Sequence, residues 1–194
     1  MPRLFTAIEL SPATREAVAA QQADVARALK GAGGASLRPV RAEQLHLTLV
    51  FVGEVPEPQV HAIQGALTPS FTREPFELAF GGFGVFPDRG PARVLWLGLQ
   101  QGAPEVLRLF EEVSDRLVGV GVPRERRPFR PHLTVGRWPE RGPAATRLTL
   151  PDTGVVAVEQ VTAVTLFESR LLPRGAEHTA LVRAHLAGAR AGLH

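Results

Sequence analysis

The order of apolar and polar positions predicts the same series of elements twice along the chain. Each series begins with an apolar strand, continues with a helix and leads through a loop into a second strand. The first helix is predicted by its content of Ala, Gln, Arg and Glu, and the second by apolar residues at helical spacing. In both series that second strand begins with His-Leu-Thr. The pattern therefore predicts a structural repeat, although identity outside the tripeptide is weak. The expected elements are strand 4–10, helix 13–30 and strand 46–52 in the first series, and strand 92–99, helix 106–118 and strand 132–135 in the second.

Shorter elements are expected around this repeat. Strands mixed with about three helices, with hairpin-like pairs at the ends, favour an α+β fold over a doubly wound sheet. The pattern predicts a helix at 57–67, strands at 76–80, 147–150, 155–167 and 179–186, and glycine-rich breaks at 31–34 and 81–90.

Composition narrows the class of protein. With 194 residues, 44% of them hydrophobic and 21% charged, the chain is typical of a soluble globular protein with a sizeable core. It has no cysteine, which excludes disulfides, thiolate nucleophiles and cysteine-ligated metals. Apolar runs are too short to span a membrane, and the first residues lack the features of a secretory leader. We therefore expect a cytoplasmic protein.

Basic charge is concentrated near the second His-Leu-Thr. Lysine and arginine number 22 against 19 acidic residues, and Lys30 is the only lysine. Arginine suits phosphate oxygens because its planar fork donates two parallel hydrogen bonds. Such a cluster suits RNA, and a solvated arginine-rich surface is an equally good explanation of the charge alone. The clustered residues are Arg124, Arg126, Arg127, Arg130, Arg137 and Arg141.

Each tripeptide predicts an imidazole and a hydroxyl on one face of a strand. Residues two apart in a strand point to the same side, so His46 lies beside Thr48, and His132 lies beside Thr134. Strict alternation places Phe51 on the opposite side, with Leu47 and Leu49. If the two strands lie together about a pseudo-twofold axis, their polar faces form one pocket.

Two histidines and two threonines suit phosphodiester cleavage. One imidazole can accept a proton from the nucleophile while the other protonates the departing oxygen, and hydroxyls can donate to the charged phosphate oxygens. A lone strand histidine is most often structural, and the repetition is what favours function. We expect no metal and no cofactor, because the remaining histidines have no ligand spacing. We interpret those residues, His61, His178, His185 and His194, as surface or core residues.

The two H-x-T strands resemble the two-histidine phosphoesterase superfamily. More narrowly, the chain is similar over nearly its whole length to the bacterial and archaeal RNA 2′,3′-cyclic phosphodiesterases, the LigT-like 2′-5′ RNA ligase family. The order and spacing of several segments carry this resemblance. They are "RLFTAIEL", "LHLTLVFVGEV", "FGVFPDRGPARVLWLGL", "RPFRPHLTVGR" and "VTLFESRLLPRGAEHTAL".

The resemblance implies a single bilobal phosphoesterase domain over residues 1–194. It implies two pseudo-symmetric, antiparallel-rich sheets with flanking helices around a central cleft, and metal-independent hydrolysis of 2′,3′-cyclic phosphate ends to 2′-phosphomonoesters. The implied proton donor is His46, the implied proton acceptor is His132, and Thr48 and Thr134 hold phosphate oxygens. Arg137 is implied as a ligand contact, and because strict alternation points it away from His132, a twist or bulge is expected near Gly136.

The expected partner is RNA with a 2′,3′-cyclic phosphate end, or a cyclic nucleotide, with no membrane and no obligate protein partner. Arg130 is expected to bind substrate, and the aromatic residues Phe51, Phe129 and Trp138 are candidates for stacking on a base, with core packing as the alternative for each. His178 stands where relatives commonly carry an aromatic residue. Two alternative functions stay open: joining of 2′-5′ ends, and RNA binding without turnover, which the two intact motifs disfavour.

Overall fold

The structure is a computed structural model that describes residues 1–30, 37–139, 142–172 and 175–188. Within these ranges it contains two antiparallel sheets and three α-helices, so the expected α+β class is confirmed. The elements are β1 (Arg3–Glu9), α1 (Pro12–Lys30), β2 (Arg38–Pro39), η1 (Ala42–Gln44), β3 (His46–Glu54), α2 (Glu57–Leu67), β4 (Phe76–Phe86), β5 (Val94–Gln101), α3 (Ala103–Val118), β6 (Leu133–Arg137), η2 (Ala145–Arg147), β7 (Val155–Val161), β8 (Ala163–Leu172) and β9 (Gly175–His185).

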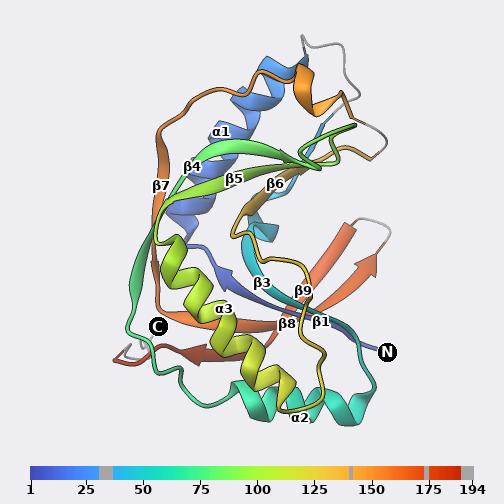
Figure 1. The fold of residues 1–194 in the computed structure, drawn as a ribbon, viewed down its shortest axis with the longest axis vertical. Helices are drawn as coiled ribbons and strands as arrows, with labels where there is room; N and C mark the ends of the chain where they lie inside the picture. Colours follow the sequence, from blue (N-terminus) through green and yellow to red (C-terminus); the bar gives the residue numbers. More distant parts are fainter. Residues whose placement is uncertain (31–36, 140–141, 173–174, 189–194) are drawn as a thin grey trace.

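The two sheets lie one above the other in Figure 1. The first has the strand order β3-β1-β8-β9 and the second the order β2-β6-β5-β4-β7. In the first sheet the motif strand β3 pairs with β1, and in the second the motif strand β6 pairs with β5. The strand–helix–strand repeat that the sequence predicts is therefore present, with one copy in each sheet.

The helices of the two series are exchanged between the sheets. Helix α1, which follows β1, contacts β6 and β7 of the second sheet, whereas α3, which follows β5, contacts β3 of the first. The apolar stripe that predicts α3 is buried in full, namely Val106, Leu109, Phe110, Val113 and Leu117. Burial of one such side chain stabilises the fold by about 1.5–3 kcal/mol. Because each helix packs across the molecule, the exchange holds the two motif strands together, and β3 and β6 contact each other directly.

The expected strand at 147–150 is wrong. Residues 145–147 form the short helix η2, and residues 148–150 belong to no strand. The backbone here bonds to a loop instead of a sheet edge: the Ala145 N–H donates to the Gly90 carbonyl at 2.8 Å. Leu148 and Leu150 still pack against the core, so their alternation reflects burial and not strand pairing.

The expected glycine-rich turn at 81–90 is wrong over its first part, because β4 continues to Phe86. Here glycine makes room for a neighbouring ring. A Cβ on Gly84 would lie 2.0 Å from a ring atom of Trp96 on β5, the strand paired with β4. The break expected at 31–34 and the end of the C-terminal tail lie outside the described residues. None of the described helices is long and apolar enough to cross a membrane.

Candidate active site

The two motif histidines have the same backbone environment. The Nδ1–H of His46 donates to the carbonyl of Gln44, and the Nδ1–H of His132 donates to the carbonyl of Arg130, each at 2.7 Å. This hydrogen bond sets the tautomer, because a neutral imidazole with its proton on Nδ1 has a free lone pair on Nε2. In both strands Nε2 is therefore the nitrogen left for proton transfer.

Both motif strands carry a β-bulge directly after the threonine. In β3, Thr48 pairs with Ala7 and Val50 pairs with Thr6, which leaves Leu49 unpaired. An extra residue in one strand shifts the alternation of its side chains. Phe51 therefore lies on the same face as His46, and the expectation that it lies behind the strand is wrong.

The bulge in β6 has the same position relative to its histidine. Thr134 pairs with Trp96 and Gly136 pairs with Leu95, which leaves Val135 unpaired. Arg137 consequently lies on the same face as His132 and Thr134. The sequence predicts such a bulge near Gly136, and the structure places it one residue earlier. We call His46, Thr48, His132, Thr134 and Arg137 together the histidine face.

A buried polar side chain supports each bulge. The Val50 N–H donates to Thr6 Oγ1 at 3.1 Å, and the Gln22 side-chain amide donates to the Val135 carbonyl at 2.6 Å. Thr6 and Gln22 are both buried, so each satisfies a backbone group that water cannot reach. Gln22 belongs to α1, and the exchanged helix thus supports the motif strand of the second sheet.

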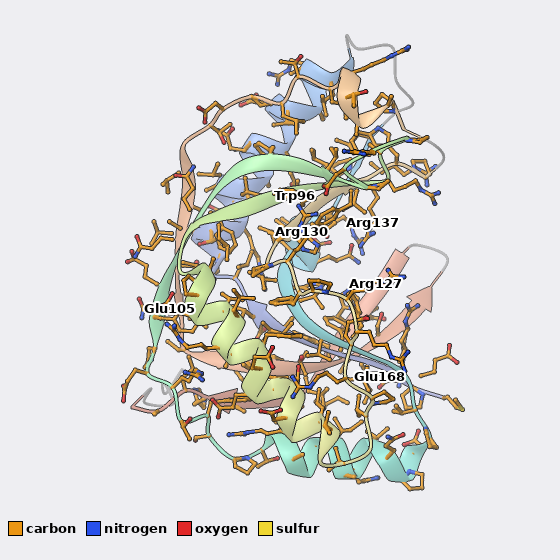
Figure 2. All side chains as sticks on the ribbon, in the orientation of Figure 1. Trp96, Glu105, Arg127, Arg130, Arg137 and Glu168 are labelled. Carbon is orange, nitrogen blue, oxygen red and sulfur yellow. The ribbon has the colours of Figure 1, made fainter. Side chains whose placement is uncertain are left out.

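Arg137 acts electrostatically on both halves of the histidine face. Burial is the main cause of the lowered pKa of His46 and of His132, and the positive charge of Arg137 lowers both further. Figure 2 shows Arg137 and Trp96 of the second sheet, and Arg130 of the loop before β6, on the side of that sheet that lies toward the first. Partial burial lowers the pKa of Arg137 itself, which remains a cation at any physiological pH.

Aromatic rings surround His46. The Phe5 ring lies 4.9 Å from the imidazole centroid, His178 lies edge-on at 5.4 Å, and Phe167 lies at 6.4 Å. Burial among them lowers the pKa of His46 to about 4, and the Gln44 carbonyl opposes this shift by stabilising the charged ring. His46 is therefore neutral at pH 7 in the free protein.

Cations and aromatic rings surround His132. Phe86 lies edge-on to the imidazole at 5.0 Å, and the Arg130 guanidinium lies 4.7 Å above the Phe86 ring. Arg130 also pairs with Asp88 at 2.8 Å, which fixes its position at the exposed rim of the site. Burial is the main cause of the lowered pKa of His132, and the charges of Arg137 and Arg130 add to it.

Of the aromatic residues predicted to stack on a base, one is exposed and two pack against other side chains. Phe51 is 69% exposed and lies 6.2 Å from Phe5, so one ring face is open to a ligand. Phe129 stacks on Phe110 of α3 at 4.3 Å, and Trp138 is buried in the core.

The arginines of the cluster also differ, in whether they form ion pairs. Arg124 pairs with Glu111 and Asp115 of α3. Arg126 and Arg127 are exposed, and neither belongs to an ion pair within the described residues. Arg141 lies outside those residues.

Several residues around the histidine face are not apparent from the motifs. Phe5 lies against His46, Phe86 lies against His132, and Trp96 packs on Phe86, whereas the sequence indicates only that they are strand residues. His178 is placed beside His46, whereas we expected a surface or core residue; its signal was the unusual histidine in "GAEHTAL". Among the described residues, no group of three or more His, Asp or Glu side chains could hold a metal ion.

Two H-x-T segments thus lie at contacting strands of two antiparallel sheets, with Arg137 on the histidine face. A family model described as the 2′-5′ RNA ligase superfamily matches residues 12–170. The chain belongs to this superfamily and, within it, to the family of RNA 2′,3′-cyclic phosphodiesterases, as its motifs predict.

Curated relatives and solved structures give the same assignment. The RNA 2′,3′-cyclic phosphodiesterase of Archaeoglobus fulgidus is 36% identical over 141 residues, which cover 73% of this chain and 75% of the relative. That of Methanothermobacter thermautotrophicus is 34% identical over 182 residues and covers 91% of this chain and 95% of the relative. Escherichia coli LigT complexed with 3′-AMP superposes with a TM-score of 0.78 at 30% identity, over 96% of this chain and 99% of LigT.

Proposed function

We propose that this chain hydrolyses the 2′,3′-cyclic phosphate of RNA ends or nucleotides to a 2′-phosphomonoester, within one domain formed by residues 1–194. The observation that carries this proposal is the histidine face, where two imidazoles with free Nε2 atoms lie on strands that contact each other and the second bulge turns Arg137 onto the same face. A cyclic phosphate bound to that guanidinium lies within reach of an acid and a base. The names of the curated relatives support the same substrate.

The proposed reaction moves one proton at each histidine. Nε2 of His132 accepts a proton from the attacking water, whose oxygen bonds to phosphorus. The bond from phosphorus to O3′ breaks, and Nε2–H of His46 delivers its proton to O3′. The 2′-phosphate remains, and a proton returns to His46 from solvent while His132 releases one.

The threonines and Arg137 stabilise the charge that develops on the phosphate. Thr48 and Thr134 are half-buried and lie on the same strand faces as the histidines, so their hydroxyls donate to non-bridging oxygens. Arg137 supplies a positive charge between them. Donors fixed in this way need no reorganisation during the reaction, which is the main advantage of such a site over water.

The lowered pKa of His46 fits the role of proton donor. An imidazolium of low pKa gives up its proton readily, but at pH 7 it must first be protonated. A bound phosphate supplies the negative charge that favours the protonated ring.

Phe51 and Arg130 are proposed to bind the rest of the substrate. The open face of Phe51 holds the base, and Arg130 holds the phosphate 5′ to it. Phe129 is less available to a base, because one face of its ring is covered by Phe110.

Replacing either histidine tests this function directly. His46→Ala and His132→Ala should each lower kcat on adenosine 2′,3′-cyclic phosphate by about 10²- to 10⁴-fold, the usual effect of losing a general acid or base. The loss for Thr48→Ala or Thr134→Ala should be smaller, because a neutral donor is removed. Formation of the 2′-monophosphate can be followed by phosphorus NMR.

His61→Ala is the matched control, since His61 is exposed on α2 and its Nδ1 also bonds a backbone carbonyl. It should leave turnover unchanged. Full activity in either motif variant contradicts the proton transfers. A protein that binds cyclic-ended RNA without any turnover favours a binding module, and joining of 2′-5′ ends faster than hydrolysis favours a ligase.

Prolonged dialysis against a strong chelator should leave kcat unchanged. The reason is that the described residues offer two proton-transfer groups on the histidine face but no set of metal ligands. The measurement compares turnover before dialysis, after dialysis, and after addition of zinc or manganese. Activity that disappears and returns with metal contradicts the scheme.

A further inference from the structure

His178 reaches His46 because the β8–β9 hairpin leaves the plane of the first sheet. Leu166 pairs with Val182 and Phe167 pairs with Ala180, so Leu181 forms a bulge in β9. Beyond it, the connected ends of the two strands rise toward the second sheet (Figure 1). The Gln44 side-chain amide donates to the Ala176 carbonyl, which ties this part of β9 to the residues just before His46. Two residues further along β9, His178 lies edge-on to both His46 and Phe5.

The hydrogen bonds of His178 differ from those of the motif histidines. Its Nδ1 is buried and has no partner, and no described residue bonds its Nε2. A neutral imidazole carries one N–H, and burying that group without an acceptor costs about 1–3 kcal/mol. The proton is therefore favoured on Nε2, at the edge of the ring that is not enclosed. The tautomer is the opposite of that in His46, and it leaves a donor beside the histidine face.

Packing alone does not explain a nitrogen at this position. Phe5 and Phe167 form an apolar surface against which a phenyl ring would pack as well, without an unpartnered polar atom. Burial lowers the pKa of His178, so the ring is neutral at pH 7 and acts as a donor rather than as a cation. The open N–H next to His46 is available to donate to a ligand atom.

We propose that His178 is a specificity-determining residue whose Nε2–H donates a hydrogen bond to the nucleoside bound against His46. The inference rests on the proposed function, because it assumes that a nucleotide occupies the histidine face. Stacking on Phe5, Phe51 or Phe167 tolerates every base, whereas a directional donor distinguishes bases by the acceptors on their edges. His178 thus allows the part of the site around His46 to discriminate between bases.

The test compares His178→Phe with the unmodified protein on the 2′,3′-cyclic phosphates of adenosine, guanosine, cytidine and uridine. The phenyl ring keeps the packing and removes the donor. We expect KM to rise about 3- to 10-fold for at least one base and by unequal factors across the four, with kcat within about twofold. His178→Gln places an amide N–H near the position of Nε2 and should restore part of the discrimination.

His185→Phe is the control, because His185 ends the same strand and also has a buried Nδ1 without a partner. It should leave the four KM values unchanged. Equal KM values for His178→Phe and the unmodified protein overturn the proposal, and so does a rise by one common factor, which would show a packing role.

A binding measurement on the unmodified protein separates this proposal from the proposed function. At least one of the four nucleoside 2′-monophosphates should shift the Nε2–H proton resonance of His178 and slow its exchange, whether or not the protein turns over cyclic nucleotides. A resonance unchanged at saturating concentrations of all four overturns the role of His178. Loss of turnover with this shift intact counts against the catalytic scheme alone. The same measurement serves if His178→Phe fails to fold.

Discussion

The half of the site around His46 and the half around His132 share a backbone and differ in chemistry. Each histidine bonds the carbonyl two residues before it, has a threonine two residues after it, and is followed by a bulge. The residue that the bulge turns onto the shared face is Phe51 in one half and Arg137 in the other. On the shared face the first half thus carries an aromatic side chain at this position and the second a cationic one, and we call them the aromatic half and the cationic half.

This difference shows how one local structure can serve two roles. The backbone positions Nε2 in the same way twice, so the geometry does not distinguish acid from base. The surroundings do: His46 lies among Phe5, Phe167 and His178, whereas His132 lies beside Phe86, over whose ring the Arg130 guanidinium is placed. An aromatic half suits a base and ribose, and a cationic half suits phosphate. The asymmetry therefore orients a nucleotide across a nearly symmetric frame.

The largest expected effect comes from removing the residue turned out by the second bulge. Arg137→Ala should lower kcat by about 10²- to 10³-fold, because a fixed donor to the charged phosphate is lost. Phe51→Ala, at the equivalent position of the first half, should mainly raise KM, by about tenfold, through lost stacking. Steady-state kinetics on adenosine 2′,3′-cyclic phosphate separates the two. The comparison fails if both variants change the same parameter by similar factors.

Acid pH should reveal the burial of His46. Its pKa is about 4 in the folded protein and near 6.5 when unfolded, so between these values the unfolded chain holds more protons. The contribution of neutral His46 to the stability of the fold is present above pH 6.5 and is lost as the pH falls toward 4, by about 3 kcal/mol. Urea unfolding of the unmodified protein at pH 7 and pH 4 measures the loss.

His46→Gln should lose less stability over the same interval, because it has no ring to protonate. His132→Gln, whose parent residue also has a lowered pKa, gives the equivalent value for the cationic half. Identical acid sensitivity in His46→Gln and the unmodified protein would show that the aromatic surroundings do not disfavour the charged imidazole.

The smallest effect concerns salt and the outer edge of the cationic half. If Arg126 and Arg127 hold upstream phosphates, the affinity for an oligonucleotide with a cyclic end should fall with salt, by a slope of roughly −0.7 per contact. A cyclic mononucleotide has no such phosphates and should respond weakly. Replacing both arginines with glutamine should flatten the first dependence and leave the second unchanged. KM measured across a salt series gives both slopes.

The matched control replaces Arg27 and Arg108 with glutamine, which removes the same charge from exposed arginines already paired with Asp24 and Glu105. It should leave the oligonucleotide slope unchanged. Parallel slopes for the two substrates would indicate a merely solvated arginine surface.

The sequence predicts those features that depend on short-range pattern. The spacing of His and Thr in each motif and the stripe on α3 predict their elements correctly, because local periodicity decides them. Strict alternation places Phe51 on the wrong face of β3, because it does not account for the bulge at Leu49. The side chain that stabilises this bulge, Thr6, lies on another strand. His178 was missed because a bend in β9 brings it to His46 across two intervening strands. The expected strand at 147–150 failed because apolar alternation does not supply a pairing partner.

The strand order of the first sheet has a consequence for how the protein is made. Strand β1 lies between β3 and β8, and Leu4 pairs with Glu168. At ribosomal speeds of about 5–20 residues per second, β1 waits on the order of ten seconds or more for β8. During that time one of its edges is open, a state in which strands pair with foreign chains. The second sheet needs nothing beyond β7, so the cationic half can mature first, and the pocket around His46 is completed only when β9 arrives.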